Sequence, residues 1–135
     1  MFPIIDVMAT DMVTVNRDTP IYEAAQLLIE HSISGLPVID AESRLVGILS
    51  EFDMLRLLIE GEVKKEQKVE DFMTPEVVAF EDTTTAIEVC EFFLNNPNKR
   101  RVPIFHDGKL VGIVTRGDIV NLIVGLRQQS PKSGI

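Results

Sequence analysis

Short apolar runs alternate with amphipathic stretches along this chain, and their order predicts a compact β-α-β-β-α unit in the first half. A β-prone run at 12–15 is followed by an apolar stripe at helical spacing within 24–28. The apolar runs 36–39 and 45–49 flank a polar turn, a pattern typical of a β-hairpin. A second helix is expected to close the unit over about 53–59, before a glycine.

The same order of runs returns in the second half of the chain, displaced by 65 residues. Leu45 corresponds to Leu110 and Asp53 to Asp118, and both differences are 65 (110 − 45 and 118 − 53). The repeat predicts a β-prone run at 77–80, a helix around 89–93, a hairpin from 102 to 114 and a helix from about 118 to 126. Each unit is too small to bury its own sheet. We therefore expect an α+β fold in which two such units pack sheet to sheet with pseudo-two-fold symmetry.

The boundaries follow from changes in composition. Residues 1–61 form the expected first repeat, the charged stretch 62–69 a connector, residues 70–127 the second repeat, and the polar residues 128–135 a flexible tail. Within the first repeat, we expect the Thr19 side chain to cap a helix that has Pro20 at its first helical position.

Composition excludes several classes of function. A net charge of −8 over 135 residues argues against a nucleic-acid partner, and no apolar run is long enough to cross a bilayer. The single cysteine, Cys90, cannot form an intramolecular disulfide, and no His/Cys cluster has the spacing of a metal site. The first residues lack the pattern of a signal peptide. We therefore expect a cytoplasmic protein without a membrane partner or a required cofactor.

Two copies of a hydroxyl residue followed three positions later by aspartate are candidate binding groups. Ser50 precedes Asp53, and Thr115 precedes Asp118, each pair at a junction between strand and helix. One interpretation is a capping box that satisfies free backbone N–H groups, and the local pattern favours it. The other is a ribose site, because a carboxylate can accept hydrogen bonds from two vicinal hydroxyl groups. The two interpretations are compatible.

The densest positive charge lies in the second repeat, at Arg100 and Arg101. Guanidinium groups match phosphate oxygens, and Arg116 adds a further candidate phosphate contact. Lys99 fits a solvated loop better. The chain has no glycine-rich phosphate loop, nucleophile elbow or metal-ligand motif, so catalysis is disfavoured.

The ordered series of segments, given twice, resembles the CBS domain, a family named after cystathionine β-synthase. In the first repeat the matching segments are 7–15, 18–20, 23–25, 33–38 and 45–53, and in the second they are 72–75, 100–103 and 112–118. No single segment is specific, but the resemblance covers nearly the whole chain. It implies a tandem pair, or Bateman module, that usually dimerises and binds adenosine-containing ligands between its repeats.

Carried over by position, the resemblance implies two ligand sites that mix residues of both repeats. The first would use Val13, Ile33, Ser34, Gly35, Arg100, Arg101, Ile113, Thr115, Arg116 and Asp118, and the second, weaker one Ile48, Ser50, Asp53, Val78, Lys99 and Arg100. Asp118 would hold the ribose and the arginines the phosphate.

Two departures from the family pattern bear on these sites: the first removes an expected threonine contact from the first repeat, and the second favours the first site. The first repeat has Ala9-Thr10 where the second has Thr74-Pro75, and the second repeat has no glycine before its x-Pro segment. Arg100 and Arg101 therefore stand where the second site should admit a base.

The expected function is a non-enzymatic sensor of an adenosine-containing ligand: AMP, ADP or ATP, with S-adenosylmethionine also considered. A homodimer and a regulated enzyme or transporter are the expected partners. The alternatives are a ligand-free structural dimerisation module, or a regulatory fragment of a larger enzyme or transporter.

Overall fold

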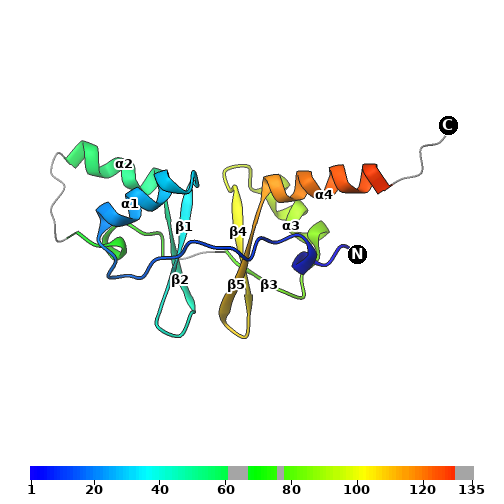
Figure 1. Ribbon diagram of the computed structural model, residues 1–135, viewed down its shortest axis with the longest axis horizontal. Helices are drawn as coiled ribbons and strands as arrows, with labels where there is room; N and C mark the ends of the chain where they lie inside the picture. Colours follow the sequence, from blue (N-terminus) through cyan, green and yellow to red (C-terminus); the bar gives the residue numbers. More distant parts are fainter. Residues whose placement is uncertain (61–66, 76–77, 130–135) are drawn as a thin grey trace. The chain divides into compact units, whose positions relative to one another are not determined.

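The fold consists of two copies of a helix, a hairpin and a second helix. The computed structural model describes residues 1–60, 67–75 and 78–129. The first copy contains α1 (Ile21–Glu30), β1 (Gly35–Ile39), β2 (Leu45–Ser50) and α2 (Glu51–Glu60), and the second contains α3 (Ala86–Asn95), β4 (Arg101–His106), β5 (Lys109–Thr115) and α4 (Arg116–Gln129). A short strand, β3 (Phe80–Glu81), precedes α3, and single 3-10 turns, η1 (Ile4–Asp6) and η2 (Val69–Asp71), open the copies (Figure 1). The predicted mixture of helices and hairpins is confirmed.

Each hairpin has the predicted position. β1 and β2 pair antiparallel, with Leu36 opposite Leu49. In the second sheet β4 lies between β3 and β5, and β3 runs parallel to β4. The β4–β5 turn places Asp107 at φ 50° and Gly108 at φ 77°, the left-handed conformation that favours glycine in a two-residue hairpin loop.

The chain divides into two spatial units that differ from the two sequence repeats. The early unit comprises Val13–Val78 with Asp107–Leu110. The late unit comprises Met1–Met12, Ala79–His106 and the residues from Val111 onward. The opening segment of the chain therefore belongs with the second repeat, and the opening segment of the second repeat belongs with the first.

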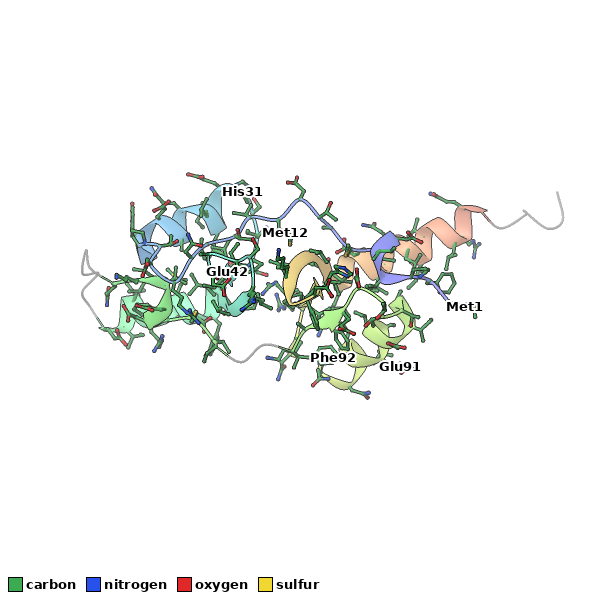
Figure 2. The ribbon with its side chains drawn as sticks, turned by 90° about the horizontal axis from the view of Figure 1, so that it is seen from below. Met1, Met12, His31, Glu42, Glu91 and Phe92 are labelled. Carbon is green, nitrogen blue, oxygen red and sulfur yellow. The ribbon has the colours of Figure 1, made fainter. Side chains whose placement is uncertain are left out.

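We call these two opening segments, Met1–Met12 and the one that contains Val69 and Thr74, the exchanged segments. Equivalent backbone hydrogen bonds hold both of them. In the late unit, the Ile4 N–H donates to the Thr84 carbonyl at 3.0 Å. In the early unit, the Val69 N–H donates to the Thr19 carbonyl at 2.9 Å. This is the equivalent bond, because Val69 corresponds to Ile4 in the repeat and Thr19 corresponds to Thr84. The side chains of Ile4 and Val69 are both fully buried. Figure 2 shows the opening segment extended along the late unit, with Met1 and Met12 at its two ends.

Each unit has its own hydrophobic core. In the early unit the core residues are Val15, Ile21, Ala24, Leu28, Leu36, Val38, Leu49, Leu57, Val69 and Phe72. In the late unit they are Ile4, Ala86, Val89, Phe93, Val102, Ile104, Val114 and Ile119. Cys90 is half-buried and packs against the late core.

Several sequence predictions need correction. Thr19 does not cap α1: Pro20 is the N-cap residue, and the Thr19 hydroxyl instead accepts a bond from the Asn16 N–H at 3.0 Å. Proline has no side-chain acceptor, and the first N–H group of the helix, that of Ile21, donates instead to the Gln67 carbonyl at 3.0 Å. In the second copy Thr85 does cap, accepting from the Glu88 N–H at 3.3 Å.

The predicted element limits also shift. The run at 12–15 forms no extended strand, since only Val15 bridges, in parallel, to Val38. Helix α4 passes Gly125 and continues to Gln129, into the predicted tail. Of the predicted connector 62–69, residues 62–66 lie outside the described residues, and so does the start of the run at 77–80. None of the helices in the described part of the chain is long and apolar enough to span a membrane.

Two strand glycines allow the exchanged segments to approach closely. A Cβ atom at Gly47 would lie 2.8 Å from the carbonyl oxygen of Thr74, which itself accepts a bond from the Ile48 N–H at 3.0 Å. At Gly112, a Cβ atom would lie 2.8 Å from Met8 Cγ and 3.2 Å from the Ala9 carbonyl oxygen. Gly47 therefore keeps its strand clear of a backbone oxygen, whereas at Gly112 the nearest atoms belong to the Met8 side chain, which can move.

Gly47→Ala should destabilise the protein by about 1–3 kcal/mol, because the backbone oxygen of Thr74 must move to admit the methyl group. Urea denaturation measures this change in the free energy of unfolding. Gly125→Ala is the matched control, since no atom lies within 4 Å of its added Cβ and alanine favours a helix interior by up to about 1 kcal/mol. Equal stability of Gly47→Ala and the wild type would contradict the close approach.

Candidate functional site

The N-terminus of α2 carries a closed network of hydrogen bonds around Asp53. One oxygen of its carboxylate, Oδ2, accepts from the Ser50 N–H at 2.9 Å and from the Ser50 hydroxyl at 3.0 Å. The Asp53 N–H donates to Ser50 Oγ at 3.2 Å. The other oxygen, Oδ1, accepts from the Thr74 hydroxyl at 3.5 Å. This pattern is a capping box with an added hydroxyl from the exchanged segment.

The N-terminus of α4 has the same cap with fewer partners. Asp118 Oδ2 accepts from the Thr115 N–H at 2.8 Å, and the Asp118 N–H donates to Thr115 Oγ1 at 3.2 Å. The position equivalent to Thr74 is Ala9, which has no hydroxyl group. Among the described residues, no side chain donates to Asp118 Oδ1. The capping interpretation is thus correct for both copies, and the Asp118 carboxylate retains an unused acceptor.

A loop carbonyl is fixed beside each helix N-terminus in the same way. The Glu51 N–H donates to the Ser34 carbonyl at 2.9 Å, and the Arg116 N–H donates to the Arg100 carbonyl at 3.2 Å. These bonds bring Ser34 next to the Asp53 cap and Arg100 next to the Asp118 cap. The sequence predicts both neighbours as site residues, and within each unit the structure places them together.

The Arg116 side chain is turned toward the loop that precedes β4. Its Nε donates to the Lys99 carbonyl at 2.9 Å, and its terminal NH2 donates to the Pro97 carbonyl. Its guanidinium carbon also lies 6.0 Å from the centre of the Phe93 ring. In this arrangement Arg116 holds the loop in place, so its predicted phosphate contact would require these bonds to break.

The predicted residues fall into two sets, one in each unit. The early unit contains Val13, Ile33, Ser34, Gly35, Ile48, Ser50, Asp53 and Val78, and the late unit contains Lys99, Arg100, Arg101, Ile113, Thr115, Arg116 and Asp118. Gly35 is fully enclosed, and Val78 is 52% exposed. Lys99 and Arg100 are exposed, whereas Arg101 is half-buried.

Thr74 contacts Asp53 but is not among the site residues predicted from the sequence. Its hydroxyl reaches Asp53 only because the second repeat's opening segment pairs with β2, where Ile48 and Thr74 form an antiparallel bridge. Sequence spacing places the two residues 21 positions apart and gives no signal of this contact. In the described part of the chain, no group of three or more His, Cys, Asp or Glu side chains is arranged to hold a metal ion.

Comparison with known proteins identifies the repeated unit. The family model described as "CBS domain" matches twice, over residues 4–60 and 69–125. The inosine-5'-monophosphate dehydrogenase of Methanocaldococcus jannaschii is 36% identical over 116 residues, which are 85% of this chain and 22% of that enzyme. The chain spans less than two thirds of the length of the first curated relatives that it matches.

Two solved structures with bound ligands are similar over nearly their whole length. CBSX2 from Arabidopsis thaliana, crystallised in complex with AMP, superposes with a TM-score of 0.82 at 31% identity, covering 94% of this chain and 99% of that one. The CBS domain pair of protein MJ0100, in complex with 5'-methylthioadenosine and S-adenosyl-L-methionine, gives a TM-score of 0.75 at 30% identity, covering 90% and 94%.

Arg116→Ala should loosen the loop at residues 97–100, because two carbonyl groups lose a charged donor. We expect a local loss of about 1 kcal/mol, reduced by solvent exposure, and faster amide hydrogen exchange at Lys99, whose N–H donates to the Asn96 carbonyl. Arg127→Ala, in the last turn of α4, removes the same charge and is the control. Unchanged exchange at Lys99 would show that Arg116 does not hold the loop.

Proposed function

As this chain belongs to the CBS-domain family and contains two copies of that domain, we propose that it is a non-enzymatic regulatory module. Its ligand is an adenosine-containing molecule, with AMP, ADP or ATP as the first candidates, held by residues of both repeats. The observation that carries the proposal is the unused acceptor of Asp118 at the N-terminus of α4, to which the backbone carbonyl of the exposed Arg100 is also bonded.

The Asp118 cap suits the ribose of such a ligand. Because Oδ2 is used by the Thr115 N–H, the carboxylate keeps its orientation while Oδ1 is available to the vicinal hydroxyl groups of a ribose. The Thr115 hydroxyl accepts from Asp118 N–H, and its own hydrogen can still be donated. The same two residues therefore cap the helix and offer an acceptor and a donor to a ligand.

The phosphate of a nucleotide would lie against positive groups of the late unit. The N-terminus of α4 carries a partial positive charge, and the Arg100 backbone is bonded to it. A guanidinium group can donate two parallel hydrogen bonds to a phosphate. Within the late unit, the half-buried apolar side chain of Ile113 is the candidate for contact with the adenine.

The ligands of the similar structures support an adenosyl molecule. The AMP of CBSX2 and the 5'-methylthioadenosine and S-adenosyl-L-methionine of MJ0100 share only the adenosine part. A ligand held by both repeats would signal by favouring one arrangement of the repeats over another, and a partner enzyme or transporter would respond to that population shift.

An exposed apolar stripe supports the proposed homodimer. On α2, Phe52 is 80% exposed, Leu55 62%, Leu58 86% and Ile59 86%. Their spacing places them along one side of the helix. On α4, Val120, Ile123 and Val124 are also exposed by 48–57%. Apolar groups in such number usually mark an interface, and a second copy of the chain would cover them.

Two alternative functions have support of their own. The closed network around Asp53 fits a structural dimerisation module whose turns are only helix caps. The match to 22% of a dehydrogenase fits a regulatory part of a larger enzyme. A ligand-binding measurement distinguishes a structural dimerisation module from our proposal. The length of the protein expressed in the cell tests whether this chain is a regulatory part of a larger enzyme.

A thermal-shift panel of adenosine-containing ligands tests the proposed function. A ligand at about 100 times its Kd should raise the free energy of unfolding by about 2.7 kcal/mol. Asp118→Ala should remove that increase, since the ribose loses its acceptor. The variant also loses a helix cap worth about 1 kcal/mol, so each protein is compared with and without ligand.

Glu91→Ala, at an exposed position of α3, is the control for loss of a carboxylate and should keep the full shift. The absence of a shift with every adenosyl ligand would refute the proposal. An undiminished shift in Asp118→Ala would remove Asp118 from the site.

Leu58→Glu should weaken the dimer, because it places a charge in the centre of the proposed interface. Sedimentation equilibrium should show at least a tenfold increase in the dissociation constant of the dimer. Glu42→Lys, in the exposed β1–β2 turn, changes charge away from the stripe and should leave the dimer intact. A monomeric wild-type protein at high concentration would contradict the proposed homodimer.

A further inference from the structure

The two exchanged segments have equivalent backbone bonds but unequal side-chain contacts. In the early unit, the Arg56 guanidinium carbon lies 4.8 Å from the centre of the Phe72 ring, and Arg56 donates to the Asp71 carbonyl at 3.3 Å. On the same segment, Lys68 Nζ lies 3.6 Å from Asp18 Oδ1. We call these contacts the clasp, because they join the segment through side chains both to α2 and to the residues before α1.

The segment Met1–Met12 has no clasp. In the described structure, none of its side chains forms a hydrogen bond, an ion pair or a ring contact. Its Phe2 has a φ of 56°, a left-handed conformation that is uncommon for a residue other than glycine. By the 65-residue correspondence, the clasp residues Arg56, Phe72 and Lys68 are replaced in that order by Asn121, Val7 and Pro3.

Backbone bonds and apolar burial hold this segment instead. The Ala86 N–H donates to the Phe2 carbonyl at 2.7 Å, and Ala9 and Ile113 form two bonds with each other, at 2.8 and 2.9 Å. The side chain of Ile4 is fully buried in the late core. All of these partners belong to the late unit. The opening segment of a second copy would therefore find the same contacts on the late unit.

A hinge joins the segment to the early unit. Residues 10–14 belong to no helix or strand, and in the structure as described none of them forms a hydrogen bond. The boundary between the two units, between Met12 and Val13, lies inside this stretch. The segment can therefore leave the late unit without breaking a hydrogen bond of the early unit.

We infer that Met1–Met12 is swapped between two copies of the chain, so that the opening segment of each copy docks on the late unit of the other. Swapping requires identical contacts in the two forms, a hinge, and a segment that opens more readily than its surroundings. The missing clasp supplies the last of these. The surface that receives the segment includes the edge of β5 at Ile113, where the partner's strand pairs antiparallel. The inference does not rest on the proposed ligand.

Two chains with single cysteines test the swap. With Cys90→Ala in both, one chain carries Ala9→Cys and the other Ile113→Cys, so no disulfide can form within a chain. Because the two positions share a pair of backbone hydrogen bonds, their Cα atoms lie about 5.5 Å apart, within the range of a disulfide. Mixed in equal amounts and oxidised with diamide, the chains should form a covalent dimer linked from position 9 to position 113, as identified by peptide mass spectrometry.

The matched control is the equivalent pair in the early unit, Thr74→Cys in one chain and Ile48→Cys in the other. This pair has the same two backbone bonds, but its segment is clasped. Its link between chains should form about tenfold more slowly, because the clasped segment opens less often. Equal rates in the two mixtures, or no link between positions 9 and 113, would overturn the inference.

Transfer of the clasp tests why the opening segment is the one that is swapped. Val7→Phe with Asn121→Arg copies the contact between Phe72 and Arg56 into the late unit. Added to both single-cysteine chains, the two substitutions should slow the link between positions 9 and 113 by about fivefold or more, since a cation over an aromatic ring stabilises the docked segment. An unchanged rate would contradict the inference.

Discussion

The close approach of a backbone segment to a strand glycine is the constraint on which both helix N-termini depend. At Gly47 the approaching backbone is that of Thr74, and at Gly112 it is that of Ala9. Each contact fixes the strand that leads directly into α2 or α4. At the end of each strand, the N–H group of Ser50 or Thr115 then donates to the carboxylate of the cap.

The two copies share their backbone hydrogen bonds, and they differ in the side chains at the N-termini of α2 and α4. The two copies keep the same caps at α2 and α4, the same loop carbonyl bonds and the same exchanged segments, because these satisfy backbone groups, for which any sequence has the same need. Side chains that face solvent at the helix N-termini are free of that demand. They differ between the copies, being neutral and acidic at α2 and mainly basic at α4.

The pattern of the sequence predicts the hairpins, the helices and the capping pairs well, because each depends on residues close together in the chain. The local pattern does not predict contacts between segments that are far apart in the sequence. The Thr74 contact with Asp53 and the exchange of Ile4 and Val69 depend on pairing across the sequence, which hydrophobic periodicity cannot report. The direction of the Arg116 side chain depends on carbonyl groups 17 and 19 residues away.

The membership of Met1–Met12 in the late unit also has a consequence for synthesis on the ribosome. These residues are synthesised before their hydrogen-bond partners, among them Thr84 and Ile113, which follow more than seventy residues later. Most of the early unit is complete by Val78, before any of those partners exists. Residues 1–12 must therefore stay without these partners while most of the early unit is being synthesised.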